Sequence, residues 1–560
     1  MQLFRTSREA SAGTEFARFA DKRETQSGVP LEFYDLTDGV TDAYTIDYVA
    51  DTGDGFNATF AVAAQVNGLF GAPEPADLLV LGGDEVYPVA SVRNYEDRLV
   101  APFDAARPAD AYGQAQLIDG AFVVALPGNH DWYDALVAFR RNFCESWIGR
   151  PAASGLVPTK PGAWRDVILS RQAIQSRSYF ALKLPHGWWL WGIDSQLDSH
   201  IDAVQLDYFS RARELISETD RVILCTARPS WLDHATKDDR YWTSNREVLV
   251  WFLDRMFGNG ENPGKPDRRH QVPIMLSGDK HHYAHYQRES ESPESPEHLV
   301  TCGGGGAYLS PTHPLEESLP VDWQLAAGTP TDYVLKKAFP TAADSRELRK
   351  KWPQIPFRNG GWWPTLVGGV QVVLAVLLTL AISKHNATAW VFSGLVALVV
   401  LGALTAFNRG FTSPWLPTYK RFVPGMVHGF AYVGAAVGCA FIVRSVLTEW
   451  SWGRGLVAVI AYLFFGALAV WGFALYLRIA DHFGFHEDQL FSALRIEDRK
   501  SYLRLTISPP THPATTGDLR IDAIGIPAVH RQNPAGPLQP SPTEPIETFH
   551  WPTRPSQHPS

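Results

Sequence analysis

Four short polar clusters in the N-terminal part of the chain have the composition of metal or catalytic sites. Each follows a predicted strand, such as LLVL at 78–81, and each places glycine beside aspartate, asparagine or histidine. Apolar runs that end in small residues are typical of buried strands followed by a loop. Carboxylate, amide and imidazole groups together suit divalent ions such as manganese, iron or zinc. The clusters are DTGD (51–54), GGD (82–84), GNHD (128–131) and GDKH (278–281).

Most of these residues also have explanations that involve no chemistry. Asp51, Asp54 and Asp131 precede predicted helices, and their carboxylates could cap helix N-termini. Tyr87 could be a buried core residue, and His282 could form only local hydrogen bonds. The ordered set of four clusters, rather than any single one, favours a functional site.

The elements that carry the clusters alternate between strand and helix. Strands separated by helices predict an α/β domain whose polar strand ends meet at one edge of the sheets. Predicted strands lie within 45–57, 78–88, 121–134, 186–196, 221–231, 273–286 and 298–314, and predicted helices lie at 58–70, 134–143, 201–216 and 245–257.

The motifs resemble a known superfamily. GD-x-x-Y at 83–87, GNHD at 128–131 and GD-x-HH at 278–282 resemble the calcineurin-like metallophosphoesterases, and D-x-G at 51–53 is similar to the purple-acid-phosphatase variant. The resemblance covers roughly residues 45–315. It implies a two-layered β-sandwich flanked by helices. With the apolar segments described below, the chain also resembles a membrane-bound bacterial branch of the superfamily.

The resemblance implies a site for two divalent ions (manganese, iron or zinc). Asp84 would bridge both ions. Asp51, Tyr87 and His281 would complete the first site, and Asn129 would bind the second ion through its amide oxygen.

The same resemblance implies hydrolysis of a phosphomonoester or phosphodiester by a metal-activated hydroxide. His130 would face the substrate and protonate or orient the leaving oxygen, and Asp131 would fix the tautomer of His130. Arg228 and His282 are candidate substrate-binding residues.

Two positions depart from the family pattern. Ala227 stands where a ligand of the second ion is expected, and Asp279 replaces a histidine, although aspartate can still bind metal. The second ion could be weakly bound, held by another group such as His234, or absent. The alternative hypothesis is therefore a degenerate phosphoesterase that acts as a membrane-bound sensor or scaffold.

Composition excludes several other classes. The 560 residues carry a net charge of −9, which provides no basic surface for nucleic acid. The cysteines are few, widely spaced and contain no CxxC pair, so a disulfide framework or structural zinc site is not expected, and a reducing compartment fits. The first residues lack the apolar core of a secretory signal.

Four uncharged apolar segments predict membrane-spanning helices at 364–383, 388–407, 425–443 and 455–477. Lysine and arginine are concentrated before the first segment, between the second and third, and after the fourth, which predicts cytoplasmic termini. We therefore expect a multi-pass protein of the cell inner membrane with a cytoplasmic catalytic domain. Its phosphoester substrate could be lipid-linked, and the oligomeric state is left open.

These features predict six regions. We expect an N-terminal extension (1–40), a metallophosphoesterase domain (41–320), a linker (321–361), a four-span domain (362–480), a small cytoplasmic β-rich module (481–530) and a disordered proline-rich tail (531–560).

Overall fold

The computed structural model describes residues 32–107, 118, 120–145, 155–158, 167–195, 201–232, 240–258, 267–290, 294–324, 329–411, 418–447, 451–511, 516–533 and 536–552. The chain forms two compact units. One is Ala343–Arg495. The other contains the chain on both sides of that insertion, up to Ala342 and from Ile496 onward.

The split unit contains two mixed sheets within the described residues. The larger has the order β14 (Ser318–Val321), β15 (Thr331–Phe339), β12 (Tyr283–Arg288), β13 (His298–Cys302), β11 (Ile274–Ser277), β10 (Arg221–Thr226), β9 (Trp188–Ile193), β8 (Phe180–Leu184), β1 (Glu32–Asp35) and β5 (Gly155–Pro158). The smaller has the order β18 (Glu544–Trp551), β17 (Leu519–Ile526), β16 (Lys500–Ile507), β2 (Tyr44–Val49), β3 (Leu78–Leu81), β4 (Phe122–Ala125), β7 (Arg171–Ala173) and β6 (Val167–Ile168).

Parallel strands form the centre of each sheet. In the smaller sheet β3 pairs in parallel with β2 and β4, and in the larger sheet β10 pairs in parallel with β9 and β11. Every residue of β3, β4 and β11 is buried, which explains why their sequences are continuously apolar rather than alternating. Because the strands are parallel, the loops that follow β2, β3 and β4 start from one edge of their sheet.

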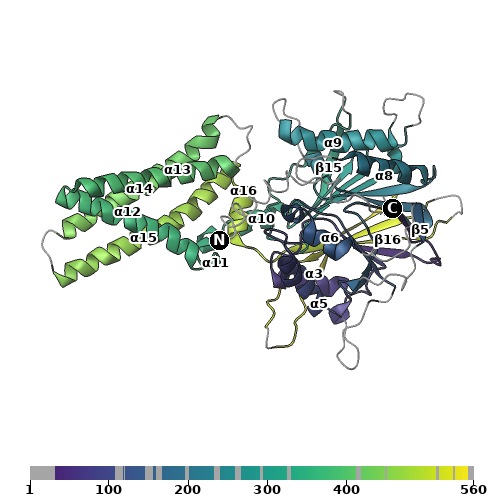
Figure 1. The fold of residues 1–560 in the computed structure, drawn as a ribbon, viewed down its shortest axis with the longest axis horizontal. Helices are drawn as coiled ribbons and strands as arrows, with labels where there is room; N and C mark the ends of the chain where they lie inside the picture. The colour runs from purple at the N-terminus through teal and green to yellow at the C-terminus, as the bar shows by residue number, and fades with distance from the viewer. Residues whose placement is uncertain are drawn as a thin grey trace, which may run out of the picture. The chain divides into compact units, whose positions relative to one another are not determined.

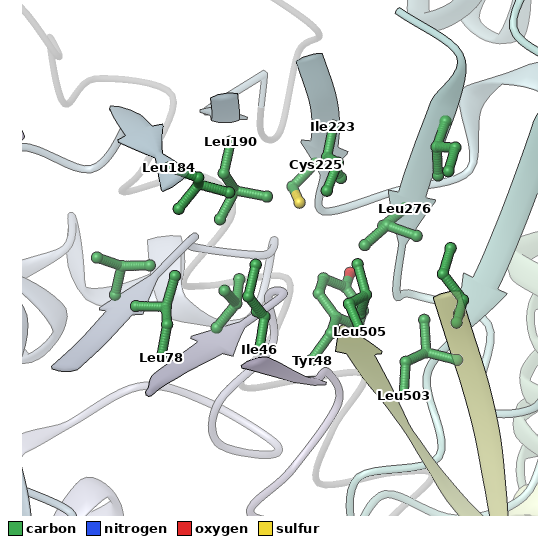
Figure 2. Close-up of a cluster of buried hydrophobic side chains, with 14 of the residues drawn as sticks. Ile46, Tyr48, Leu78, Leu184, Leu190, Ile223, Cys225, Leu276, Leu503 and Leu505 are labelled. Carbon is green, nitrogen blue, oxygen red and sulfur yellow. The ribbon is translucent and has the colours of Figure 1, made fainter. Parts of the chain in front are cut away.

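The two sheets share one hydrophobic core. Figure 2 shows side chains of the larger sheet, such as Leu190 and Cys225, directed toward side chains of the smaller sheet, such as Ile46, Leu78 and Leu505. All of these residues are almost fully buried.

Helices cover the outer faces of the sheets (Figure 1). On the larger sheet, α8 (Ala203–Glu214) and α9 (Arg240–Phe257) pack Phe209 and Phe252 against Trp191 of β9. On the smaller sheet, α3 (Phe56–Val66), α5 (Ala101–Ala105) and α6 (Val137–Phe143) share a core cluster with the outer residues of β2–β4. Mixed α/β layers therefore enclose the strand ends, as the alternating sequence pattern predicts.

Three boundaries differ from those expected from the sequence. Part of the N-terminal extension is β1, which lies between β5 and β8, and part of the linker is β15, which pairs with β12 and β14. The tail does not form a separate module, because β16 pairs antiparallel with β2, and residues 544–551, expected to be disordered, form β18.

The inserted unit contains four long apolar helices, as predicted. They are α12 (Trp362–Lys384), α13 (Ala387–Phe411), α14 (Thr418–Val446) and α15 (Trp452–His482). Each is long and apolar enough to cross a membrane. Small residues allow close packing: a Cβ on Gly368 or Gly466 would lie 3.0 Å from the carbonyl oxygen of the other. Shorter helices, α10 (Ala342–Arg349), α11 (Ile355–Arg358) and α16 (Glu487–Leu494), flank this bundle in the sequence.

Candidate metal-binding and catalytic site

Three aspartates immediately after the central strands adopt an uncommon backbone conformation. Asp51 follows β2, Asp84 follows β3 and Asp279 follows β11, with φ angles of 60°, 54° and 64°. Residues other than glycine rarely adopt this left-handed backbone conformation, although aspartate tolerates it better than most residues do. Repeated strain of this kind at strand ends is typical of functional sites.

The hydroxyl group of Tyr87 lies at the centre of a buried cluster. It is 2.7 Å from Asp51 Oδ1, 3.0 Å from Asp84 Oδ2 and 2.9 Å from His281 Nε2. His281 Nε2 is also 3.6 Å from Asp51 Oδ1. The fold thus brings together four residues, from the loops after three different strands, that the sequence assigns to one metal site.

Burial dominates the electrostatics of these carboxylates. It raises the pKa of Asp84 to about 7 and, together with the neighbouring Asp84 charge, raises the pKa of Asp51 well above its ordinary value. Among the described residues, the hydrogen-bond donors to these two carboxylates are the Tyr87 hydroxyl and the backbone N–H groups of His130 and Asp279, with no lysine or arginine among them. A bound cation would supply the missing positive charge.

His281 is prepared to act as a neutral ligand. Its Nδ1 lies 2.8 Å from the backbone carbonyl oxygen of Tyr308, which accepts the Nδ1 hydrogen and leaves Nε2 directed at Tyr87. Burial lowers the pKa of His281 to about 3, so the ring is uncharged near neutral pH. A backbone carbonyl that fixes the tautomer in this way is common for histidine ligands of metals.

The other oxygen of Asp84 faces the GNHD loop. The backbone N–H of His130 donates to Asp84 Oδ1 at 2.8 Å. A Cβ on Gly128 would lie only 2.2 Å from the same oxygen, so glycine is required for this close approach. Asn129 donates from Nδ2 to the Tyr133 hydroxyl at 2.8 Å, which leaves its amide oxygen for another partner.

The partner of His130 differs from the expected one. Its Nδ1 lies 2.6 Å from the carbonyl oxygen of Pro88, so this backbone group, and not Asp131, fixes its tautomer. Asp131 instead accepts hydrogen bonds from the Tyr95 hydroxyl at 2.5 Å and from the backbone N–H of Gly128 at 2.9 Å. Asp131 therefore orders the loop itself. The His130 ring packs 4.3 Å from the Tyr87 ring, which places His130 at the edge of the cluster.

The loop after β10 contains Ala227 and forms the side of the site where an expected ligand is replaced by a methyl group. A Cβ on Gly83 would lie 2.9 Å from the Ala227 Cβ, so an apolar methyl group stands beside the GGD loop. Arg228 is next to it. Burial works to raise the pKa of Asp279, but the charges of Arg228 and Lys280 hold it below its ordinary value. His234, the suggested substitute ligand, lies outside the described residues.

The donor set fits one cation better than two. Asp51 Oδ2 is buried and has no hydrogen-bond partner, and glycines at 278 and 303 leave room beside it, since a Cβ on either would lie 2.7 or 2.3 Å away. The Tyr87 hydroxyl lies between the proposed ligands. Among the described residues, no three His, Cys, Asp or Glu side chains are spaced to hold a metal ion. The chemistry suits a first ion that includes Tyr87 among its ligands. Among the described residues, Ala227 offers no ligand to a second ion on the side that it faces.

Several contributors escaped sequence analysis. The carbonyl groups of Pro88 and Tyr308 act through the backbone, so residue identity carries no signal for them. Glu85 is buried beside Asp131, and burial raises its pKa well above the ordinary value. Conversely His282, a candidate substrate-binding residue, is only 3% exposed and therefore lies in the interior.

Comparisons with known proteins add little. No protein-family model matches the chain, and no curated protein sequence matches it. One similar solved structure is described as GAP50, the anchor in the inner membrane complex of Plasmodium, with 11% identity, 48% of this chain and 74% of that chain covered, and a TM-score of 0.29. Another is PhoD, with 10% identity, 49% and 59% covered, and a TM-score of 0.28. Likenesses this distant carry no argument about what this chain binds or catalyses.

Proposed function

We propose that this protein is a membrane-anchored, metal-dependent phosphoesterase with a metallophosphoesterase-like sandwich. The observation that carries the proposal is the contact of the Tyr87 hydroxyl with Asp51, Asp84 and His281 in a buried cluster. The motif resemblance supports the same conclusion independently. The substrate is a phosphomonoester or phosphodiester.

In this proposal the residues of the chain divide the work. Asp51, Asp84, Tyr87 and the neutral His281 would hold a divalent ion, and their burial would keep bulk water from competing with it. When bound, the ion would act as a Lewis acid toward a phosphoryl oxygen and lower the pKa of a bound water. His130 keeps one ring nitrogen on the Pro88 carbonyl, so its other nitrogen is the one that exchanges a proton with the leaving oxygen.

The strand pairing is consistent with the membrane topology. The segments before and after the four long helices form adjacent strands, β2 and β16, and must therefore lie on the same side of a membrane. An even number of crossings satisfies that requirement. The distribution of lysine and arginine favours the cytoplasmic side of the inner membrane.

The test is hydrolysis of bis-p-nitrophenyl phosphate and p-nitrophenyl phosphate by the full chain in detergent with Mn²⁺. We expect activity that chelation removes and that Asp84→Asn and His130→Ala each abolish or reduce strongly. Activity that persists in both variants, or no activity in the wild type on either ester, would contradict the proposal.

A second function is favoured by the Ala227 side of the site. A chain that binds no ion there, and whose described acidic and imidazole groups are not spaced for a metal, fits a sensor or scaffold that has lost catalysis. Metal analysis of the purified protein separates the two. A stoichiometric transition metal favours the enzyme, and none favours the scaffold.

A further inference from the structure

The chain that follows the four long apolar helices contacts a loop beside the candidate site. This glycine loop, defined as residues 303–309, directly follows β13. On one side it meets the loop after β2: Gly305 N–H donates to the Ala50 carbonyl at 2.9 Å, and Ala307 N–H donates to the Asp51 carbonyl at 2.8 Å. Its Tyr308 carbonyl accepts the Nδ1 hydrogen of His281. The glycine loop therefore supports two of the proposed ligands.

The other side of the glycine loop rests on the tail. Ser501 N–H of β16 donates to the Gly304 carbonyl at 3.0 Å, and the Leu309 N–H donates to the Ile496 carbonyl at 3.3 Å. A Cβ on Gly304 would lie 2.3 Å from the Ser501 hydroxyl, so only glycine permits this approach. These contacts join residues about two hundred positions apart in the sequence.

Lys500 provides a charged contact to the same loop. Its side chain is fully buried, and its Nζ donates to the Ala307 carbonyl. Burial lowers the pKa of Lys500 to about 8, and the nearby Asp54 carboxylate opposes that shift. A buried lysine is rare without a compensating role, because desolvating an ammonium group is costly. Lys500 thus binds the carbonyl oxygen of Ala307, and the N–H of the same residue donates to the Asp51 carbonyl.

We propose that the strand after the membrane helices is part of the candidate site and that Lys500 is a positioning residue. Lys500 holds the glycine loop where its backbone fixes Asp51 and the tautomer of His281. This inference rests on the proposed function for its catalytic meaning, but the anchoring itself is measurable without catalysis.

The experiment compares full-chain Lys500→Met with the wild type by hydrogen exchange and by Mn²⁺ titration. Lys336→Met, an exposed lysine on β15, is the matched control. We expect amide exchange of residues 303–309 to rise about tenfold or more while β3 is unchanged, and the Mn²⁺ dissociation constant to weaken by about 10- to 100-fold, as for other residues that orient metal ligands. Exchange and affinity equal to those of the control would overturn the proposal.

Two further results distinguish failure of the proposed function from failure of the role proposed for Lys500. If the wild type binds no Mn²⁺, the proposed function fails, and loop exchange alone decides the role of Lys500. If Lys500→Met does not fold, Lys500→Gln, which keeps an N–H donor without the charge, takes its place. In the wild type, the Gly305 and Ala307 amides must be protected about as strongly as those of Leu503 and Leu505, and exchange faster by about 100-fold would overturn the anchoring.

Discussion

The two carboxylate oxygens of Asp84 have neighbours of different kinds. Oδ2 meets the Tyr87 hydroxyl, which also contacts Asp51 and His281, so this side is built from buried side-chain ligands. Oδ1 meets only a backbone N–H of the GNHD loop, and Ala227 stands beside the adjoining GGD loop. The proposed cation site therefore depends on the Oδ2 side, where side chains converge, and the Oδ1 side contributes a backbone contact.

The largest effect is expected from Asp84, because it belongs to both sides. Asp84→Asn keeps the shape but removes the charge, so we expect loss of Mn²⁺ binding and of ester hydrolysis to background. Isothermal titration and the p-nitrophenyl assays measure both. Retained stoichiometric binding by Asp84→Asn would show that the Tyr87 cluster does not depend on this carboxylate.

His130 belongs to only one of these sides. His130→Ala should lower kcat by roughly 10²- to 10⁴-fold, the usual contribution of a general acid or base, and leave Mn²⁺ affinity unchanged. Steady-state kinetics with two leaving groups checks this, since the loss should be smaller for the better leaving group. A parallel loss of metal affinity would instead place His130 among the ligands.

The buried carboxylates also predict a pH dependence of stability in the metal-free protein. Burial raises the pKa of Asp84 to about 7, whereas an unfolded aspartate titrates near 3.9. Between these values the folded chain binds more protons than the unfolded chain, so the free energy of unfolding falls as pH rises from about 4 to 7, by on the order of a few kcal/mol.

Thermal unfolding in EDTA at pH 4.5 and 7.5 measures this change. Asp84→Asn should remove much of the decrease, and Mn²⁺ should reverse it in the wild type by binding the charged carboxylates. An identical pH profile in the wild type and the variant would contradict the assignment of the effect to Asp84.

The smallest expected change is a gain of metal binding and hydrolysis on the side of the site that faces Ala227. Ala227→His adds an imidazole beside Gly83, and we expect a second bound Mn²⁺ with a rise in hydrolysis on the order of tenfold, equivalent to about 1.4 kcal/mol. Ala227→Leu adds bulk without a ligand and serves as the control. If both variants behave alike, this side of the site is not limited by a missing ligand.

Sequence patterns were sufficient to place the candidate residues that follow central strands at the ends of those strands. Asp84 and His281 come after short runs that are buried on both faces, and such runs are recognisable without a partner strand. The four long apolar helices were predictable for the same reason, since length and uniform apolarity are local properties. The role of Asp131 was not, because its partners depend on how two loops meet.

The outer strands β15 and β18 were not predicted, because their sequences lack the apolar pattern of a buried strand. TDYVLKKAF in β15 carries two adjacent exposed lysines, and EPIETFHW in β18 has proline as its second residue, so neither resembles a buried strand. Glu547 of β18 becomes meaningful only in the fold, where it accepts a hydrogen bond from the Tyr283 hydroxyl at 2.7 Å and lies 3.0 Å from His285 Nδ1.

The sequence alone determined the kinds of groups available for chemistry, the strands that precede them and the four apolar helices, because each depends on neighbours along the chain. Only the tertiary structure decided that Tyr87 is the common contact of the proposed ligands and that Pro88 and Tyr308 orient the two histidines. It also decided that β16, from beyond the membrane helices, completes the sheet beside β2. Those outcomes depend on pairing and burial between segments that lie tens to hundreds of residues apart, which no local pattern records.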